Sequence, residues 1–162
     1  MSLLMIGCGK MGGALLEQWA TKTQHAITII TPSMQPAPAN VTQLPSVEGI
    51  KGDTFDIIVI AIKPQLIEAV LPAYRNCLAE GGCIVSIAAG YSIASIEKLI
   101  GPQPIIRIMP NLPAKIGRGV SALYSNTHCT QAHAAVAKEL TDAAGHTLVV
   151  DSEDTIDKVT AV

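Results

Sequence analysis

Near the start of the chain, residues 3–12 read Leu3-Leu4-Met5-Ile6-Gly7-Cys8-Gly9-Lys10-Met11-Gly12, and they are the strongest indication of the fold. An apolar strand runs directly into a G-x-G-x-x-G turn, and a helical segment over residues 13–20 follows. This order of strand, glycine-rich turn and helix is the context in which the motif binds a dinucleotide. We therefore expect a dinucleotide site at the start of the chain, with a purely structural glycine-rich turn as the alternative.

Each glycine of the motif has a separate role in such a site. Gly7 permits the tight turn off the strand, Gly9 leaves the backbone free for a pyrophosphate, and Gly12 lets the helix pack close to the strand. The N-terminus of the following helix offers free N–H groups and a partial positive charge. The turn is therefore expected to hold phosphate groups.

Composition restricts the class of protein. The 162 residues suffice for one domain with a real core, and the hydrophobic fraction is 49% with only 3% aromatic residues. A core of Ile, Val, Leu and Ala is typical of parallel strands buried on both faces. A net charge of −2 offers no basic footprint for nucleic acid, and no apolar run reaches the length of a membrane span.

The cysteines and the N-terminus indicate a cytoplasmic protein. Cys8, Cys77, Cys83 and Cys129 form no C-x-x-C pair, so reduced thiols are favoured over disulfides or zinc. The four histidines show no metal-like spacing, and no metal site is expected. Because a strand is expected by residue 3, we expect no signal peptide.

Strands and helices alternate along the chain, which predicts an α/β fold: a Rossmann-like, doubly wound, mainly parallel sheet with helices on both faces. The expected strands are Leu3–Ile6, Ala26–Ile30, Ile57–Ile62, Cys83–Ala88, Ile105–Met109, Gly119–Tyr124 and His146–Val150. The expected helices are residues 13–20, Gln65–Leu78 with a break at Pro72, Ser92–Ile100 capped by Ser92 or Ser95, Thr130–Ala144 and Glu153–Val162, with a turn at Gly81-Gly82.

Residues 31–47 are the irregular stretch of this pattern. Pro32, Pro36, Pro38 and Pro45 oppose a regular helix there. We expect an irregular connection, with a short strand near Val47–Ile50.

The end of the second strand bears on cofactor choice. NAD-binding chains place Asp or Glu there, bonded to the ribose 2′-hydroxyl. Here the sequence reads Thr31-Pro32-Ser33 without a carboxylate, and the two hydroxyls suit a 2′-phosphate. NADP(H) is therefore favoured over NAD(H), with Lys10 of the glycine-rich turn as the candidate cation, while an ordinary turn remains the alternative.

Other strand ends carry small or special residues where ligands of such sheets bind. Lys63 faces either the cofactor or solvent, and Asn111 either directs its amide to the ligand or satisfies its own turn. The candidate cofactor-binding residues are Gly7, Cys8, Gly9, Lys10, Met11, Gly12, Thr31, Pro32, Ser33, Ala61, Ile62, Lys63, Pro64, Ala88, Ala89, Gly90 and Asn111.

The sequence shows no acid–base pair and no nucleophile motif, and Ser86, Ser92 and Ser95 lack a G-x-S-x-G elbow. No catalytic residue is therefore assigned. A sequence without such motifs fits hydride transfer, in which the cofactor supplies the chemistry.

Four blocks carry a family resemblance: Ile6–Gly12, Ala61–Gln65, Ser86–Gly90 and Arg107–Ala114. In this order and spacing the chain resembles pyrroline-5-carboxylate reductase. The closing Asp157–Val162 is similar to the segment that leads into the family's Ser-Gly-Ser-Gly-Pro-Ala motif, which is absent here. Two departures are the shorter, proline-rich residues 34–47 and Leu112, where Thr is more usual.

The resemblance implies reduction of Δ1-pyrroline-5-carboxylate to L-proline with NAD(P)H, the last step of proline synthesis. It implies a cofactor domain over residues 1–151 and, over residues 152–162, the start of a linker helix to a helical domain. That domain would hold most of the substrate pocket and the homo-oligomer interface. The chain alone is then expected to bind NADP(H) weakly without appreciable turnover.

Two other interpretations remain open. The chain also fits another NADP-dependent reductase of the β-hydroxyacid dehydrogenase type, whose lysine lies in a separate helical domain. A dinucleotide-sensing module without catalytic activity is the third.

Overall fold

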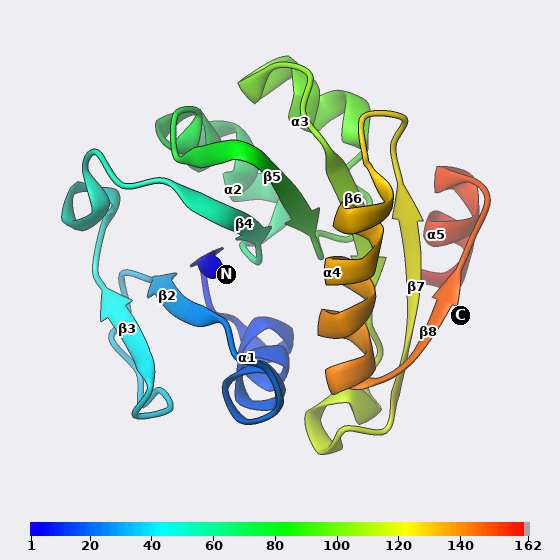
Figure 1. The fold of residues 1–162 in the computed structure, drawn as a ribbon, viewed down its shortest axis with the longest axis horizontal. Helices are drawn as coiled ribbons and strands as arrows, with labels where there is room; N and C mark the ends of the chain where they lie inside the picture. Colours follow the sequence, from blue (N-terminus) through cyan, green and yellow to red (C-terminus); the bar gives the residue numbers. More distant parts are fainter. Residues whose placement is uncertain (161–162) are drawn as a thin grey trace.

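The computed structural model describes residues 1–160, in which a single eight-stranded sheet carries helices on both faces (Figure 1). The strands are β1 (Ser2–Ile6), β2 (Ala26–Ile30), β3 (Val41–Leu44), β4 (Phe55–Ile60), β5 (Leu78–Ser86), β6 (Ile105–Met109), β7 (Gly119–Ser125) and β8 (Gly145–Val149). The α-helices are α1 (Lys10–Lys22), α2 (Pro64–Val70), α3 (Ile93–Ile100), α4 (Gln131–Ala143) and α5 (Glu153–Thr160). Three short 3-10 helices are η1 (Val47–Ile50), η2 (Leu71–Tyr74) and η3 (Leu112–Ile116).

The strand order is β3-β2-β1-β4-β5-β6-β7-β8, and β1 to β6 are mutually parallel. The chain builds outward from β1 to β3 and then returns to place β4 on the other side of β1. This reversal is the topological switch point of a doubly wound sheet. The expected Rossmann-like fold is therefore confirmed.

The last two strands run against the others. β7 is antiparallel to β6, and β8 is parallel to β7. Only η3 and its flanking residues join β6 to β7, and a parallel crossover needs a dozen or more residues. The sheet is thus mainly, not wholly, parallel.

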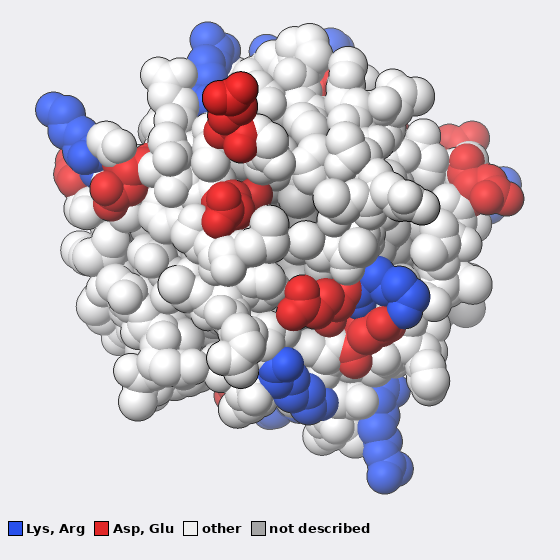
Figure 2. All heavy atoms as spheres, viewed as in Figure 1, with Lys and Arg blue, Asp and Glu red and all other residues white. Residues whose placement is uncertain are grey.

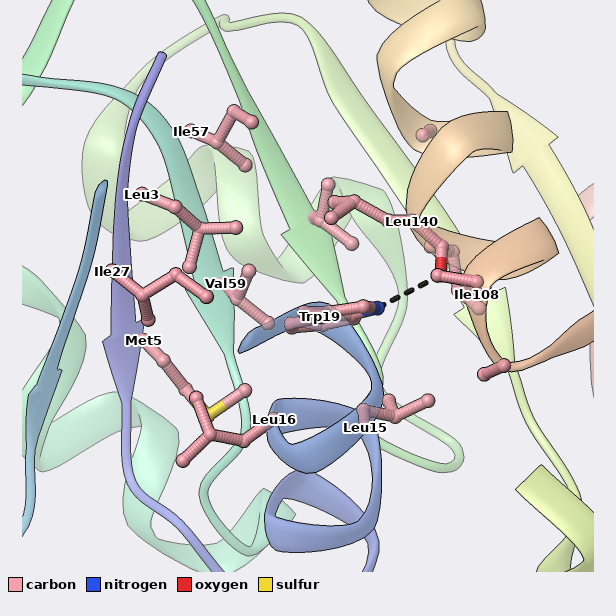
Figure 3. Packing of buried hydrophobic residues seen from close by; sticks show 14 of the residues in the cluster. Leu3, Met5, Leu15, Leu16, Trp19, Ile27, Ile57, Val59, Ile108 and Leu140 are labelled. Carbon is pink, nitrogen blue, oxygen red and sulfur yellow. Dashed lines mark hydrogen bonds between the residues drawn. The ribbon is translucent and has the colours of Figure 1, made fainter. Parts of the chain in front are cut away.

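α1 and α4 cover the face of the sheet that is turned to the viewer in Figure 1. Trp19 on α1 is 1% exposed, and its indole Nε1–H donates to the Leu140 carbonyl of α4 at 2.8 Å (Figure 3). Figure 3 shows its ring between the helix and the apolar side chains of β1 and β4, Val59 among them. Aromatic packing and this buried hydrogen bond join both helices to the sheet.

The opposite face is covered by α2 and α3, with α5 beside β6 and β7. Isoleucines at helical spacing on α3, Ile93, Ile96 and Ile100, pack into the second core cluster. Ser92 caps α3, as expected, since its hydroxyl accepts the Ser95 N–H at 3.1 Å. Ile156 anchors α5 in a third cluster with Met109 and Ala122.

The connection over residues 31–46 lacks a helix, as the prolines predicted, but the expected strand was misplaced. Val47–Ile50 forms η1, and the strand is Val41–Leu44. These four residues are free of proline and pair parallel with β2. Pro45 has no N–H to continue the ladder, so the strand ends there.

Two further expectations were wrong around β5. Gly81-Gly82 is not a turn outside the strand: β5 already begins at Leu78, and the register with β4 shifts between Phe55 and Ile57. Gly81 has φ +74°, which suits the irregularity. The helix expected over residues 65–78 does not reach Leu78: α2 ends at Val70 and η2 ends at Tyr74. The expected break at Pro72 is confirmed, since Pro72 cannot donate to an α-helical ladder.

Several boundaries also move by a few residues. α1 begins at Lys10 rather than 13, β4 ends at Ile60, and β5 ends at Ser86. The earlier strand ends leave Ala61–Lys63 and Ile87–Gly90 as loops. The expected last residues of the final helix, 161–162, lie outside the described residues.

The surface in view carries scattered charges of both signs between wide uncharged areas (Figure 2). Within residues 1–160, no helix is long and apolar enough to cross a membrane.

Candidate functional site

The candidate residues gather at one edge of the sheet. Because β1, β2, β4, β5 and β6 are parallel, their carboxyl ends share that edge. The candidate cofactor-binding residues lie in the loops after these strands or in the first turns of α1 and α2, which begin there. In open α/β sheets ligands bind at this edge, beside the switch point between β1 and β4.

Gly7 is required by the turn itself. Its φ is +83°, and a Cβ placed there would lie 2.5 Å from Ile62 Cγ2 and 3.0 Å from the Ala61 carbonyl oxygen. Its N–H donates to the Ile30 carbonyl at 2.8 Å. The turn off β1 is therefore locked against the loop that follows β4.

Gly9 faces open space. No heavy atom lies within 4 Å of the position that its Cβ would take, and the residue is exposed. It is the N-cap residue of α1, without a side-chain cap and with no acidic residue in the first turn. The first N–H groups of a helix lack intrahelical partners, so this end of α1 has both room and donors for an anion.

Gly12 provides the close helix–strand contact expected of it. A Cβ there would lie 3.2 Å from Ala61 Cβ and 3.8 Å from Met5 Sδ. This spacing brings the first turn of α1 against both strands of the switch point. Any larger side chain would push the helix away from the loop.

Cys8 is half-buried between the glycines, near the start of α1. Burial, and then the Glu17 carboxylate, raise the pKa of its thiol above 9.0. The side chain is therefore uncharged at neutral pH. It adds no negative charge beside the donors of α1.

The turn after β2 is held by its own backbone and hydroxyls. The Thr31 N–H donates to the Leu44 carbonyl at 3.1 Å, and Thr31 Oγ1 lies 3.4 Å from Ser33 Oγ. Thr31 is 6% exposed, whereas Pro32 and Ser33 are exposed. The Ser33 hydroxyl is thus the accessible one of the pair.

Two exposed lysines border this edge. Lys10 is the first residue of α1, and Lys63 is the N-cap residue of α2, followed by Pro64 in the first turn. The Ala61 N–H donates to the Ile6 carbonyl at 2.9 Å, which fixes the loop before Lys63. Each ammonium group therefore stands on an anchored backbone.

The loop after β5 presents small residues. The Ala88 N–H donates to the Ser86 hydroxyl at 3.3 Å, and the Ile87 N–H donates to the Ile60 carbonyl at 3.1 Å. Ala89 and Gly90 are exposed, and Gly90 has φ +67°. A flat ligand can approach this backbone closely.

Asn111 lies after β6, and the oxygen of its side-chain amide already has a hydrogen-bond partner. Its Oδ1 accepts the Val120 N–H of β7 at 2.9 Å. The carboxamide oxygen therefore serves the β6–β7 connection rather than a ligand. The neighbouring Leu112 is 83% exposed.

Sequence reasoning missed a charged group behind this edge. Arg107 on β6 is 1% exposed and pairs with Glu153 and Asp157 of α5. The signal was present in the sequence: an arginine inside the apolar strand Ile105–Met109, and two carboxylates four residues apart on the last helix.

Elsewhere on the surface, the hollows lie apart from the candidate cofactor-binding residues. Two hollows of about 360 and 570 Å³ lie around η1, away from the loops after β1 and β5. Thr28, Thr42 and Asp53 are among the residues that line the first. Residues 1–160 contain no group of three or more His, Cys, Asp or Glu side chains placed to hold a metal ion.

Comparisons with known proteins agree with this geometry. A family model described as "NADP oxidoreductase coenzyme F420-dependent" matches residues 2–90. The pyrroline-5-carboxylate reductase of Pseudomonas aeruginosa is 44% identical over 108 residues, which are 66% of this chain and 40% of the relative. The solved 1-pyrroline-5-carboxylate reductase of Streptococcus pyogenes has a TM-score of 0.84 and 32% identity, over 99% of this chain and 62% of that one.

A third neighbour is Plasmodium falciparum pyrroline carboxylate reductase, solved with NADP bound. Its TM-score is 0.84 at 24% identity, over 96% of this chain and 59% of that one. At this identity the likeness shows the fold.

Fold, loops and matches together define the class: the chain belongs to the family described as "NADP oxidoreductase coenzyme F420-dependent". Within that class, the relatives and solved structures described above are pyrroline-5-carboxylate reductases. The chain spans 40% of the Pseudomonas relative and 62% of the Streptococcus one.

Proposed function

We propose that the chain is the cofactor-binding part of an NADPH-dependent pyrroline-5-carboxylate reductase. The observation that carries this proposal is the open space over Gly9, at the N-terminus of α1 and beside the switch point. The proposed substrate, Δ1-pyrroline-5-carboxylate, is taken from the names of the relatives. The proposed cofactor is the one bound in the Plasmodium neighbour.

The residues present fit a dinucleotide. Gly9 forms a cradle that a Cβ would fill, and Lys10, Met11 and Gly12 supply the first N–H groups of α1 for the pyrophosphate. On one side Thr31, Pro32 and Ser33 would border the adenosine ribose. On the other, the small residues of the loops after β4 and β5 would admit the nicotinamide ribose: Ala61, Ala88, Ala89 and Gly90.

The turn after β2 favours NADPH over NADH. Residues 30–33 hold no carboxylate to bond a 2′-hydroxyl or to repel a 2′-phosphate. The exposed Ser33 hydroxyl and the exposed Lys10 ammonium are the groups that would meet the phosphate. We place both at the 2′-phosphate end of the site.

The reduced nicotinamide, when bound, supplies the hydride that an electrophilic imine carbon accepts. The chain's own residues would then bind and orient the cofactor and exclude water from it. No catalytic residue is assigned among them. Lys63, which stands on the anchored N-terminus of α2, would face the phosphates or the nicotinamide ribose.

We infer that residues 1–151 form the nucleotide-binding domain and that residues 152–162 begin the connection to a helical domain with the substrate pocket and the homo-oligomer interface. The relatives' greater length supports this division. Because most of the pocket would lie outside this chain, we expect it to bind NADPH without appreciable turnover.

Titration calorimetry of the chain with NADPH and with NADH tests the proposal. NADPH is expected to bind, and to bind more tightly than NADH. A chain that binds neither, or that prefers NADH, would contradict the assignment of the loop or of the Thr31–Ser33 turn.

A further inference from the structure

A buried arginine links the sheet to the last helix. The Arg107 guanidinium donates from Nη1 to Glu153 Oε1 and from Nη2 to Asp157 Oδ1, each at 2.9 Å. Its side chain is 1% exposed, while the two carboxylates are 26% and 50% exposed. The planar fork of an arginine suits two acceptors one helical turn apart, so α5 is held in a defined position on β6.

Glu153 has a second partner that Asp157 lacks. The Ile93 N–H donates to the same Glu153 Oε1 at 2.7 Å. Ile93 is the first residue of α3, directly after the Ser92 cap. One carboxylate oxygen therefore joins α5, β6 and the start of α3.

Only Tyr91 and Ser92 separate the start of α3 from the loop Ala88–Gly90. The near end of that loop is fixed to β4 and β5 through the Ile87 N–H and the Ser86 hydroxyl. Beyond its far end, the chain is held to Glu153 at Ile93. The carboxylate is thus the link through which a shift of α5 reaches the loop.

We propose that Glu153 is a positioning residue, which couples the docking of α5 to the placement of the loop Ala88–Gly90 and so to dinucleotide affinity. The proposal rests on the proposed function, because the loop affects affinity only if it borders the cofactor. A displacement of α5 would then change cofactor affinity through the contact between Glu153 and Ile93. Cofactor binding would in turn stabilise α5 in its docked position.

Three substitutions separate positioning from charge. Glu153→Asp keeps the charge for Arg107 but is one methylene too short to reach both Nη1 and the Ile93 N–H. Glu153→Gln keeps the reach and an acceptor oxygen but removes the charge. Asp157→Asn is the matched control, since Asp157 contacts Arg107 alone among these groups.

NADPH affinity of the chain is measured by calorimetry for each variant, with urea unfolding as the check on stability. We expect Glu153→Asp to weaken binding by about fivefold, and the other two variants to bind like the parent chain. Equal effects of Glu153→Asp and Asp157→Asn, no effect of Glu153→Asp, or a larger loss in Glu153→Gln would overturn the proposal.

Amide hydrogen exchange gives a readout that needs no ligand. Glu153→Asp is expected to speed exchange at Ala89, Gly90 and Ile93, and Asp157→Asn is not. Unchanged exchange at these amides would overturn the coupling. A parent chain that binds no NADPH would instead contradict the proposed function, and exchange would still decide whether Glu153 joins α5 to the loop.

Discussion

Replacing Gly7 by alanine should destabilise the fold far more than the same change at Gly9. At Gly7 the residue must adopt φ +83°, and its Cβ would lie 2.5 Å from Ile62 Cγ2. The left-handed conformation costs roughly 1–2 kcal/mol and the overpacking a further 1–3 kcal/mol, so Gly7→Ala should lower the free energy of unfolding by about 2–5 kcal/mol.

Gly9 has none of these constraints. Its φ of −74° and ψ of −168° suit any residue, and no heavy atom approaches its Cβ position within 4 Å. The expected loss of stability is at most about 1 kcal/mol, because alanine is a poorer N-cap than glycine. The added methyl group fills the proposed pyrophosphate space, so NADPH affinity should fall at least about tenfold, or 1.4 kcal/mol.

Urea unfolding followed by tryptophan fluorescence measures both stabilities, since Trp19 is the sole tryptophan and is buried. Gly13→Ala is a matched control: its Cβ would meet only Cys8 Sγ, at an ordinary 3.8 Å. We expect Gly13→Ala to retain stability and NADPH binding. Equal destabilisation by Gly7→Ala and Gly9→Ala, or full NADPH binding by Gly9→Ala, would refute the roles given to the two glycines.

Further expectations concern charge, acid stability and thiol reactivity. Arg107→Leu should lower the free energy of unfolding by about 2–4 kcal/mol in urea titrations, because it removes two charge-assisted hydrogen bonds, and an unchanged midpoint would contradict the pairing. Hydrogen bonds from the Ser2 N–H and hydroxyl hold the pKa of Asp56 below its usual 3.8. A carboxyl group whose pKa is lowered by folding stabilises the fold at neutral pH, and this contribution is lost as the pH falls through the lowered pKa. Asp56→Asn should therefore make the free energy of unfolding fall less steeply as the pH is lowered below the usual carboxylate range. The same pH dependence in the variant and the parent chain would contradict the role of Asp56. Burial raises the pKa of Cys83 to about 12, so this thiol should react with a disulfide reagent at pH 8 only after unfolding; modification of the native chain at Cys83, located by peptide mapping, would contradict the burial.

The fold was largely predictable because its core strands are mainly apolar runs, and Gly7 follows the first of them while Pro110 follows β6. β2 and β6 have the predicted bounds, and β1 is one residue longer. Val41–Leu44 was missed because four residues of mixed polarity among prolines carry little periodic signal. The irregularity at Gly81 is set by pairing with β4, which a local sequence does not reveal.

The candidate site was predictable in part for the same reason. Carboxyl ends of parallel strands meet at one edge, so strand assignment alone brought the candidate loops together. The pairing of Asn111 Oδ1 with Val120 depends on the antiparallel turn of β7, which was not foreseen. The partners of Arg107 lie 46 and 50 residues away, and only the packed structure shows that they meet.

We place the dinucleotide at the carboxyl edge of the sheet, over Gly9. Backbone amide NMR of the 15N-labelled chain, titrated with NADPH, tests this placement. We predict that the largest shifts fall on Gly7–Gly12, Ser33, Ala61–Lys63 and Ala88–Gly90. Shifts confined to the hollow beside η1, at Thr28, Thr42 and Asp53, or no shifts at all at millimolar NADPH, would contradict that placement.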